Sequence, residues 1–218
     1  MYTRNSFLSN ISPVVKNLLI INVIMYLATV LIGDSMYEKF SLFYFSSPFF
    51  KPYQLVSHMF MHGSFTHIFF NMYTLFIFGN VLERVWGGQK FLFYYFVTGI
   101  GAALLHLGVA YLQLQGYISN GNFMGVQSIM LTPTVGASGA IYGLLLAYGM
   151  LFPNNIMQLI FPPVALKAKW FVIIFGALEL LLGLSGRGGN IAHFAHLGGM
   201  IFGYFLIMYW KKNNRMYY

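Results

Sequence analysis

The sequence predicts an all-α membrane protein, a bundle of six transmembrane helices with both termini on the inner side. Of its 218 residues, 58% are apolar and only 7% are charged, whereas a water-soluble domain carries about 25% charged residues. So few charges do not cover a surface that faces water. Because a helix needs roughly 20 apolar residues to cross a bilayer core, residues 1–218 are expected to form a single membrane domain with little else.

Six apolar runs are separated by segments rich in Gly, Pro, Asn and Ser, residues that interrupt regular structure. Backbone polar groups that face lipid must bond within their own segment, so the runs are expected to be helices. The expected spans lie near residues 14–33, 56–81, 91–114, 135–152, 168–185 and 190–210.

The first three spans differ in the polar residues they carry. Residues 14–33 have no small-residue cleavage site behind a basic stretch, which favours a retained helix over a cleavable signal peptide. Residues 91–114 carry one histidine, His106. Residues 56–81 carry three histidines and a nearby asparagine: His58, His62, His67 and Asn71.

The fourth span is short for a membrane helix. From Gly136 to Phe152 it has 17 residues, about 26 Å at 1.5 Å per residue, so its outer end is expected to lie below the membrane surface. Pro133 and Pro153 flank it, and Ser138 falls in its first turn. The last two spans also contain ionisable side chains: Glu179, His193 and His196.

The orientation follows from the Lys and Arg residues, which concentrate on the inner side of membrane proteins. With both termini inside, nine of the twelve lie inside: Arg4, Lys16, Arg84, Lys90, Lys167, Lys169, Lys211, Lys212 and Arg215. Only Lys39, Lys51 and Arg187 lie outside. The net charge of +8 is scattered near span ends, so no nucleic-acid partner is expected.

The first external loop, residues 34–55, contains eight Phe and Tyr residues together with two Pro. It is too interrupted to cross the membrane and too aromatic for water, which predicts an interfacial structure partly in the outer leaflet. An ordinary loop with interfacial aromatic residues is the alternative.

The orientation brings Ser138, His196, His67 and Asn71 to one shared depth in the outer half of the membrane. Polar groups at such depth are costly and usually mark function. Each also has a structural interpretation, because a serine packs well between membrane helices. His58 and His193 could be interfacial anchors, His106 a hydrogen-bonded packing residue, and Glu179 a snorkelling or paired side chain.

The set supports a serine nucleophile activated by a histidine base. Asn71, His67 and the Ser138 N–H, in a helix first turn, are candidate donors to an oxyanion. The acidic residues are Asp34, Glu38, Glu83 and Glu179. Only Glu179 could orient the histidine, and we expect a Ser–His dyad without it.

Other chemistries find less support. The chain has no cysteine, which excludes disulfides, thiol nucleophiles and cysteine-bound zinc. The G-x-S-x-G motif fails because Ala140 follows Gly139, and H-E-x-x-H is absent. No metal or cofactor is expected, although His58 and His62, four residues apart, with His67 nearby, leave a metal or haem site open.

The segments "GASGAIYG", "HGSFTHIFFN", "AHLGGMIFG" and "GNVLERVWG" resemble the serine motif, the H-x₄-H-x₃-N segment, the sixth-helix motif and a short cytoplasmic stretch of the rhomboid family of intramembrane serine proteases. The resemblance covers residues 12 to 211. It implies a six-helix rhomboid-like bundle that cleaves transmembrane protein substrates in the lipid bilayer.

The resemblance also implies residue roles. Ser138 would be the nucleophile and His196 the base, while His67 and Asn71 would join the Ser138 N–H in the oxyanion hole. Tyr142 would stack beneath His196. The remaining residues would be structural: His62 would stabilise the region above the site, Glu83 would anchor the inner end of the second span, and Gly136, Gly139, Gly199 and Gly203 would allow close helix packing.

The chain departs from the family pattern in the first external loop, where Tyr53 and Gln54 stand at the positions of a Trp-Arg pair that some members carry. An integral membrane protein of the bacterial inner membrane, with its site open to the outside, is the expected setting. A non-catalytic rhomboid-like protein that binds membrane helices, or a small transporter, is the alternative. Substrate, pathway and oligomeric state are not encoded in these motifs.

Overall fold

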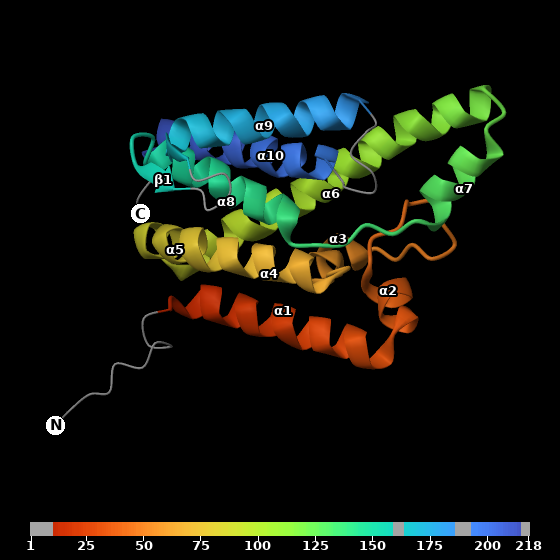
Figure 1. Ribbon diagram of the computed structural model, residues 1–218, viewed down its shortest axis with the longest axis horizontal. Coiled ribbons are helices and arrows are strands. Elements are labelled where there is room, and N and C mark those ends of the chain that lie inside the picture. The colour runs from red at the N-terminus through yellow and green to blue at the C-terminus, as the bar shows by residue number, and fades with distance from the viewer. Residues whose placement is uncertain (1–10, 159–163, 186–192, 215–218) are drawn as a thin grey trace.

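A computed structural model describes residues 11–158, 164–185 and 193–214 (Figure 1). Arg4, Arg187 and Arg215, which entered the charge count, lie outside the described residues, as do the first three residues of the span expected over 190–210.

The described chain is mostly helical. Its α-helices are α1 Pro13–Ile32, α2 Asp34–Phe40, α3 Gln54–Ser57, α4 Phe65–Thr74, α5 Asn80–Trp86, α6 Gly88–Ser119, α7 Phe123–Leu131, α8 Ser138–Leu151, α9 Ala168–Ser185 and α10 His193–Lys212. A 3-10 turn, η2 His58–Phe60, follows α3, and a π-helical segment, η3 Leu75–Gly79, joins α4 to α5. Two short strands, β1 Ile156–Gln158 and β2 Ala165–Lys167, pair antiparallel.

Four helical stretches among the described residues are long and apolar enough to cross a membrane. They are Pro13–Ile32, Phe65–Trp86, Gly88–Ser119 and Ala168–Ser185, and the apolar α8 is shorter. Leu31 on α1 and Leu184 on α9 are 84% and 70% exposed. Apolar surface of this extent suits lipid rather than water, and the chain is an integral membrane protein.

The span expected over 56–81 differs from a single helix. The helical structure is interrupted at residues 61–64. The helix α4 begins at Phe65, where the Ser64 hydroxyl caps its first turn by accepting the His67 N–H at 3.1 Å. His58 and His62 therefore precede the membrane-spanning helix instead of lying on it. The helix then continues through η3 and α5 to Trp86.

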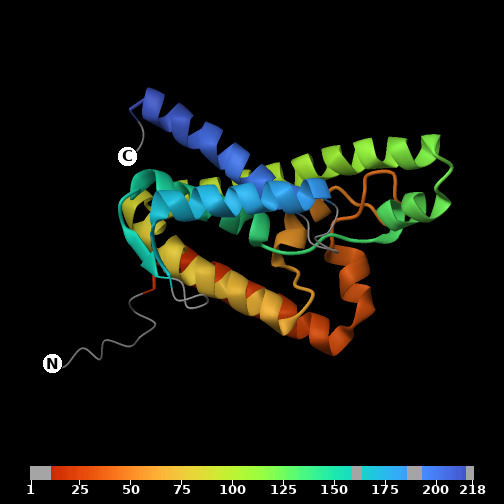
Figure 2. The same cartoon turned by 45° about the horizontal axis from the view of Figure 1, so that its top comes forward.

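The helix α8 packs against both α6 and α10, which also pack on each other, and α1 lies along α4 and α5 (Figures 1 and 2). In both views α6 extends beyond its neighbours, and α7 folds back at its far end. Only 14 residues long, α8 spans about 21 Å, less than the expected segment.

Glycines allow this close packing, but not all at the expected contact. A Cβ on Gly199 of α10 would lie 1.8 Å from the Gly139 carbonyl oxygen of α8, so these two helices touch through backbone. Gly203 instead faces Tyr94 and Thr98 of α6. Gly136 precedes α8 and faces His67 on α4 rather than α10.

Glu83 on α5 holds the start of α1. Its buried carboxylate accepts the N–H groups of Val14 and Val15 at 3.0 and 2.8 Å. These belong to the first turn of α1, where N–H groups have no partner within the helix and the dipole favours a negative charge. Glu83 thus ties α1 to the second spanning helix.

Candidate active site

The segment that leads into Ser138 is held by backbone hydrogen bonds to residues between α2 and α4. Leu42 and Thr134 exchange two backbone hydrogen bonds of 2.9 and 2.8 Å, and the Gly136 N–H donates to the His58 carbonyl at 2.9 Å. Gly136 has φ +124°, a conformation that glycine adopts readily. The helix α8 then begins at Ser138 itself, so the Ser138 N–H lies in a first turn.

Ser138 meets His196 across the contact between α8 and α10. The His196 Nε2 and Ser138 Oγ atoms are 2.9 Å apart, within hydrogen-bond distance. The Tyr142 ring, one turn after Ser138, stacks on the His196 ring with centroids 4.2 Å apart and planes 4° apart. The structure thus brings together the three residues expected at the centre of the site, in a geometry suited to proton transfer.

The buried carboxylate of Glu179 on α9 lies against the same histidine. Its Oε2 is 2.6 Å from His193 Nδ1 and 3.0 Å from His196 Nδ1, the latter pair not aligned as a regular hydrogen bond. The Tyr142 hydroxyl donates to Oε1. Sequence reasoning set Glu179 aside, although a lone acid in an apolar span is the signal that could have found it.

His67 and Asn71 line the same cavity as Ser138. The Asn71 side chain is buried, and its Nδ2 has no hydrogen-bond partner among the described residues. His67 lies beside Gly136 and contacts the His62 ring edge-on at 5.0 Å. Both therefore present nitrogen atoms close to the Ser138 end of α8.

His62 lies in the break before α4 and is fully buried, with neither ring nitrogen hydrogen-bonded among the described residues. Burial, with a smaller contribution from His67, lowers the pKa of His62 to about 3. The ring is therefore neutral at physiological pH and packs above His67 without adding charge.

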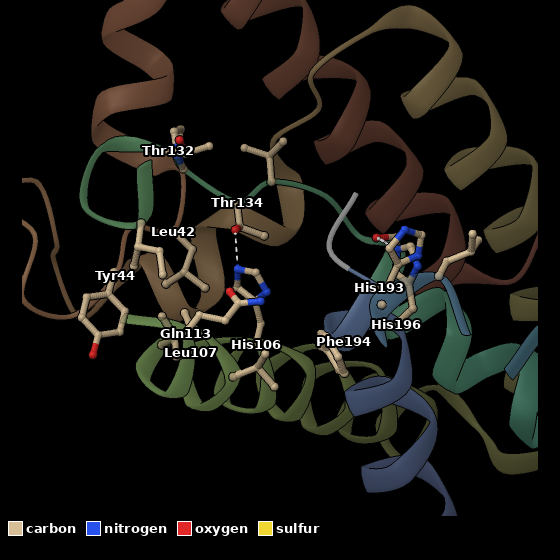
Figure 3. A pocket seen from close by; sticks show the side chains of 18 of the residues that line it. Leu42, Tyr44, His106, Leu107, Gln113, Thr132, Thr134, His193, Phe194 and His196 are labelled. Atoms are coloured by element: carbon tan, nitrogen blue, oxygen red, sulfur yellow. Dashed lines mark hydrogen bonds between the residues drawn. The ribbon is translucent and has the colours of Figure 1, made fainter. Parts of the chain in front are cut away.

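The cavity has a volume of about 850 Å³ and extends well beyond Ser138. Figure 3 shows His193 and His196 at one end, and Leu42 and Tyr44 at the other. Between them, His106 Nε2 is 2.8 Å from the Thr134 hydroxyl. The hydrogen-bonded packing role expected for His106 agrees with this contact.

The cavity also bears on the question of metals. Among the described residues, Glu179, His193 and His196 are the one group whose possible ligand atoms all lie within 4.8 Å of one another. The carboxylate oxygens of Glu179 already contact the Nδ1 atoms of the two histidines and the Tyr142 hydroxyl. His58, His62 and His67 form no such group in the described chain, and His58 Nδ1 is 2.8 Å from the Gln54 carbonyl oxygen.

Comparison with known families matches residues 50–213 to the Rhomboid domain. The chain belongs to the rhomboid family. This confirms the resemblance that the motifs indicated.

Three relatives of this rhomboid chain differ in the extent of their match. Rhomboid protease AarA of Providencia stuartii is 31% identical over 147 residues, 66% of this chain and 51% of AarA. Rhomboid protein 1, mitochondrial, of Saccharomyces cerevisiae is 27% identical over 150 residues, 68% of this chain and 39% of its own. Rhomboid protease GlpG of Yersinia pseudotuberculosis is 27% identical over 218 residues, 98% of this chain and 69% of GlpG. The chain thus spans about half the length, or less, of the first two.

Gln54 provides an anchor for the loop over residues 34–55, where this rhomboid chain lacks the Trp-Arg pair. The Gln54 side chain is fully buried. Its Nε2 donates to the carbonyls of Glu38, Lys39 and Phe49 at 3.4, 3.2 and 3.0 Å. Its Oε1 accepts the N–H groups of Phe43 and Lys51 at 3.4 and 3.1 Å. One side-chain amide thus bonds to backbone groups from Glu38 to Lys51. The sequence position of Gln54 alone did not indicate this role.

Replacing Gln54 by alanine is therefore expected to loosen residues 38–51. Backbone groups that the amide now satisfies would lose their partner, at about 1–3 kcal/mol for each one left buried, less where water enters. Hydrogen exchange in detergent should show faster exchange of the Phe43 and Lys51 amides. Tyr53→Ala is the control, because Tyr53 is 52% exposed, and equal exchange in both variants would contradict the anchoring role.

Proposed function

We propose that the chain is an intramembrane serine endopeptidase that cleaves single-span membrane proteins in or near their transmembrane segment. The observation that carries the proposal is the 2.9 Å contact between Ser138 Oγ and His196 Nε2 in a cavity of a membrane protein. Two of the relatives are named rhomboid proteases, which supports the same activity. Ser138 is the nucleophile and His196 the general base.

The reaction follows from this pair. His196 Nε2 takes the Ser138 proton as Oγ attacks the scissile carbonyl carbon, and the carbonyl oxygen becomes an oxyanion. His196 then gives that proton to the leaving amine, and the carbon–nitrogen bond breaks to form an acyl-enzyme. A water molecule, deprotonated by His196, hydrolyses the ester and restores Ser138. The flat stack with Tyr142 holds the imidazole through these steps.

The oxyanion is stabilised by Asn71, His67 and the Ser138 N–H. Asn71 Nδ2 is buried in the site with no hydrogen-bond partner in the part of the chain that the structure describes, and an unpaired buried donor is costly unless a substrate uses it. The Ser138 N–H adds the positive end of the α8 dipole. His62 supports His67 from above, and Gly139 and Gly199 bring Ser138 and His196 within reach.

Replacing Asn71 by alanine should lower kcat for cleavage by about 10²–10³-fold, the effect of removing one oxyanion donor. KM should change much less, because the ground-state carbonyl carries little negative charge. Steady-state cleavage of a fluorogenic single-span substrate in detergent measures both values. Asn22→Ala is a control, since Asn22 is also buried but bonds to the Leu18 carbonyl within α1. An Asn71 variant that retains full kcat would exclude this role.

The arrangement in the membrane is a six-helix bundle with both termini inside, in a bacterial inner membrane, with the site open to the outside. The residues supporting it are the basic side chains Lys211 and Lys212 in the last turn of α10 and Lys167 beside α9. The short α8 leaves Ser138 below the outer surface, and water reaches it through the cavity. Substrate enters sideways from lipid between the second and fifth spans, α4–α5 and α9.

A serine-directed fluorophosphonate tests the proposed function directly. The wild-type protein in detergent should be labelled at Ser138, and heat-denatured protein should not, because labelling requires the activated hydroxyl. Absence of labelling together with absence of substrate cleavage would favour a rhomboid-like protein that binds membrane helices without catalysis.

A further inference from the structure

Glu179 is the one acidic side chain at the site, and the dyad mechanism gives it no role. The chain has four acidic residues, and the other three lie elsewhere: Asp34 and Glu38 in α2, and Glu83 on α5 at the inner end. A carboxylate inside a membrane protein is costly and usually serves function. Its position beside His196 Nδ1, opposite the nitrogen that faces Ser138, is that of the acid in a catalytic triad.

We propose that Glu179 is a positioning residue that holds His196 in the tautomer and orientation in which Nε2 accepts the Ser138 proton. The inference rests on the proposed protease function. A carboxylate is only an acceptor, so the Nδ1 atom 3.0 Å from Oε2 is favoured as the protonated nitrogen. The Nε2 lone pair then faces the Ser138 hydroxyl at 2.9 Å.

The carboxylate is itself held from two helices. His193 Nδ1 on α10 lies 2.6 Å from Oε2, and the Tyr142 hydroxyl on α8 donates to Oε1. Both donors keep the carboxylate beside His196 and offset the cost of burying it. Tyr142 therefore acts twice, with its ring against His196 and its hydroxyl on Glu179. His193, without an assigned role from the sequence, becomes the partner of Glu179.

Titratable groups face His196 from each element packed around it. They are His67 on α4, His106 on α6, Tyr142 on α8, Glu179 on α9 and His193 on α10. Glu179 is the only one that carries a negative charge at neutral pH. Its charge attracts a proton onto the neighbouring imidazole, so its removal has a predictable effect on the pH dependence of cleavage.

The test is Glu179→Gln, which keeps the size of the side chain and removes the charge. We expect kcat to fall by about 10²-fold, less than the ~10⁴-fold effect of replacing a well-aligned triad acid by its amide, with KM little changed. The acid limb of the kcat/KM profile should move to lower pH. Glu179→Asp, which keeps the charge, should recover part of the rate.

Glu83→Gln is the matched control, because it neutralises the other buried carboxylate of the chain, far from Ser138. It should lower the unfolding temperature and leave the acid limb in place. If Glu179→Gln does not fold, Tyr142→Phe carries the test. Loss of the hydroxyl donor from Oε1 leaves the carboxylate a stronger proton acceptor, so the acid limb should move to higher pH.

Three outcomes would overturn the inference. The first is a folded Glu179→Gln variant with wild-type kcat and an unmoved acid limb. The second is a reduced kcat with an unmoved acid limb and a lower unfolding temperature, which would make Glu179 purely structural. The third is wild-type activity that EDTA removes and zinc restores, which would make the cluster a metal site. If wild-type protein neither cleaves nor reacts with fluorophosphonate, the proposed function itself fails.

Discussion

Ser138→Ala and His196→Ala are each expected to abolish cleavage of a single-span substrate. Residues of a catalytic unit typically cost on the order of 10⁴–10⁶-fold in kcat when removed. Ser138→Ala removes the only atom that attacks the carbonyl, and His196→Ala removes the base 2.9 Å away. Neither change enlarges a side chain, so both proteins should fold and bind substrate.

The measurement is the appearance of cleaved substrate in liposomes, with fluorophosphonate labelling in parallel. The double variant should be no less active than either single variant, because the two residues act as one unit. Ser119→Ala is the matched control: Ser119 ends α6, and its hydroxyl bonds only to the Gly116 carbonyl among the described residues. Cleavage at the wild-type rate by either Ser138→Ala or His196→Ala would rule out the dyad.

Gly199→Ala is expected to be the most disruptive single-methyl change in the bundle. The added Cβ would lie 1.8 Å from the Gly139 carbonyl oxygen and 2.8 Å from its carbon. Both are backbone atoms, so no rotamer change relieves the clash, and α8 and α10 must separate. Overpacking typically costs about 1–3 kcal/mol, and we expect at least the upper end of that range for the free energy of unfolding.

Separation of the two helices would also lengthen the contact between Ser138 and His196, so cleavage and labelling should both fall. Gly108→Ala on α6 is the control, since a Cβ there meets nothing within 4 Å and alanine is favoured over glycine in a helix by about 1 kcal/mol. Unfolding temperatures of the two variants in the same detergent provide the comparison. A Gly199 variant as stable as Gly108→Ala would show that the two helices are free to separate.

The proximity of Ser138 and His196 was predictable from sequence because it depends on coarse quantities. The lengths of the apolar runs and the distribution of Lys and Arg set the depth of each residue. Because the backbone groups of a membrane helix bond within the helix, each apolar run was expected to form a helix across the membrane, which left few alternative folds. The family assignment was also predictable, because each motif is an unbroken stretch of sequence that can be read without the fold.

Features that depend on helix rotation or on a single turn were not predictable. Glu179 faces the bundle interior because the side of α9 that carries it packs on α10. In a span that is apolar on every side, the sequence does not indicate which side packs against the other helices. The break at residues 61–64 depends on one serine cap within an apolar run. Gly203 faces α6 rather than α8. The sequence could not show this, because a small residue indicates a close helix contact without identifying the neighbouring helix.

The π-helical segment η3 sets the angular phase of the second spanning helix. A regular α-helix turns by about 100° per residue, so Asn71 and Glu83, twelve residues apart, would point about 120° away from each other. A π-bulge accommodates one additional residue in the turn, which reduces the offset to about 20°. Leu75–Gly79 therefore sets the angular relation between Asn71, which lines the cavity with Ser138, and Glu83, which binds α1. The angular relation between the two ends of this helix is thus set by five residues that lie between them.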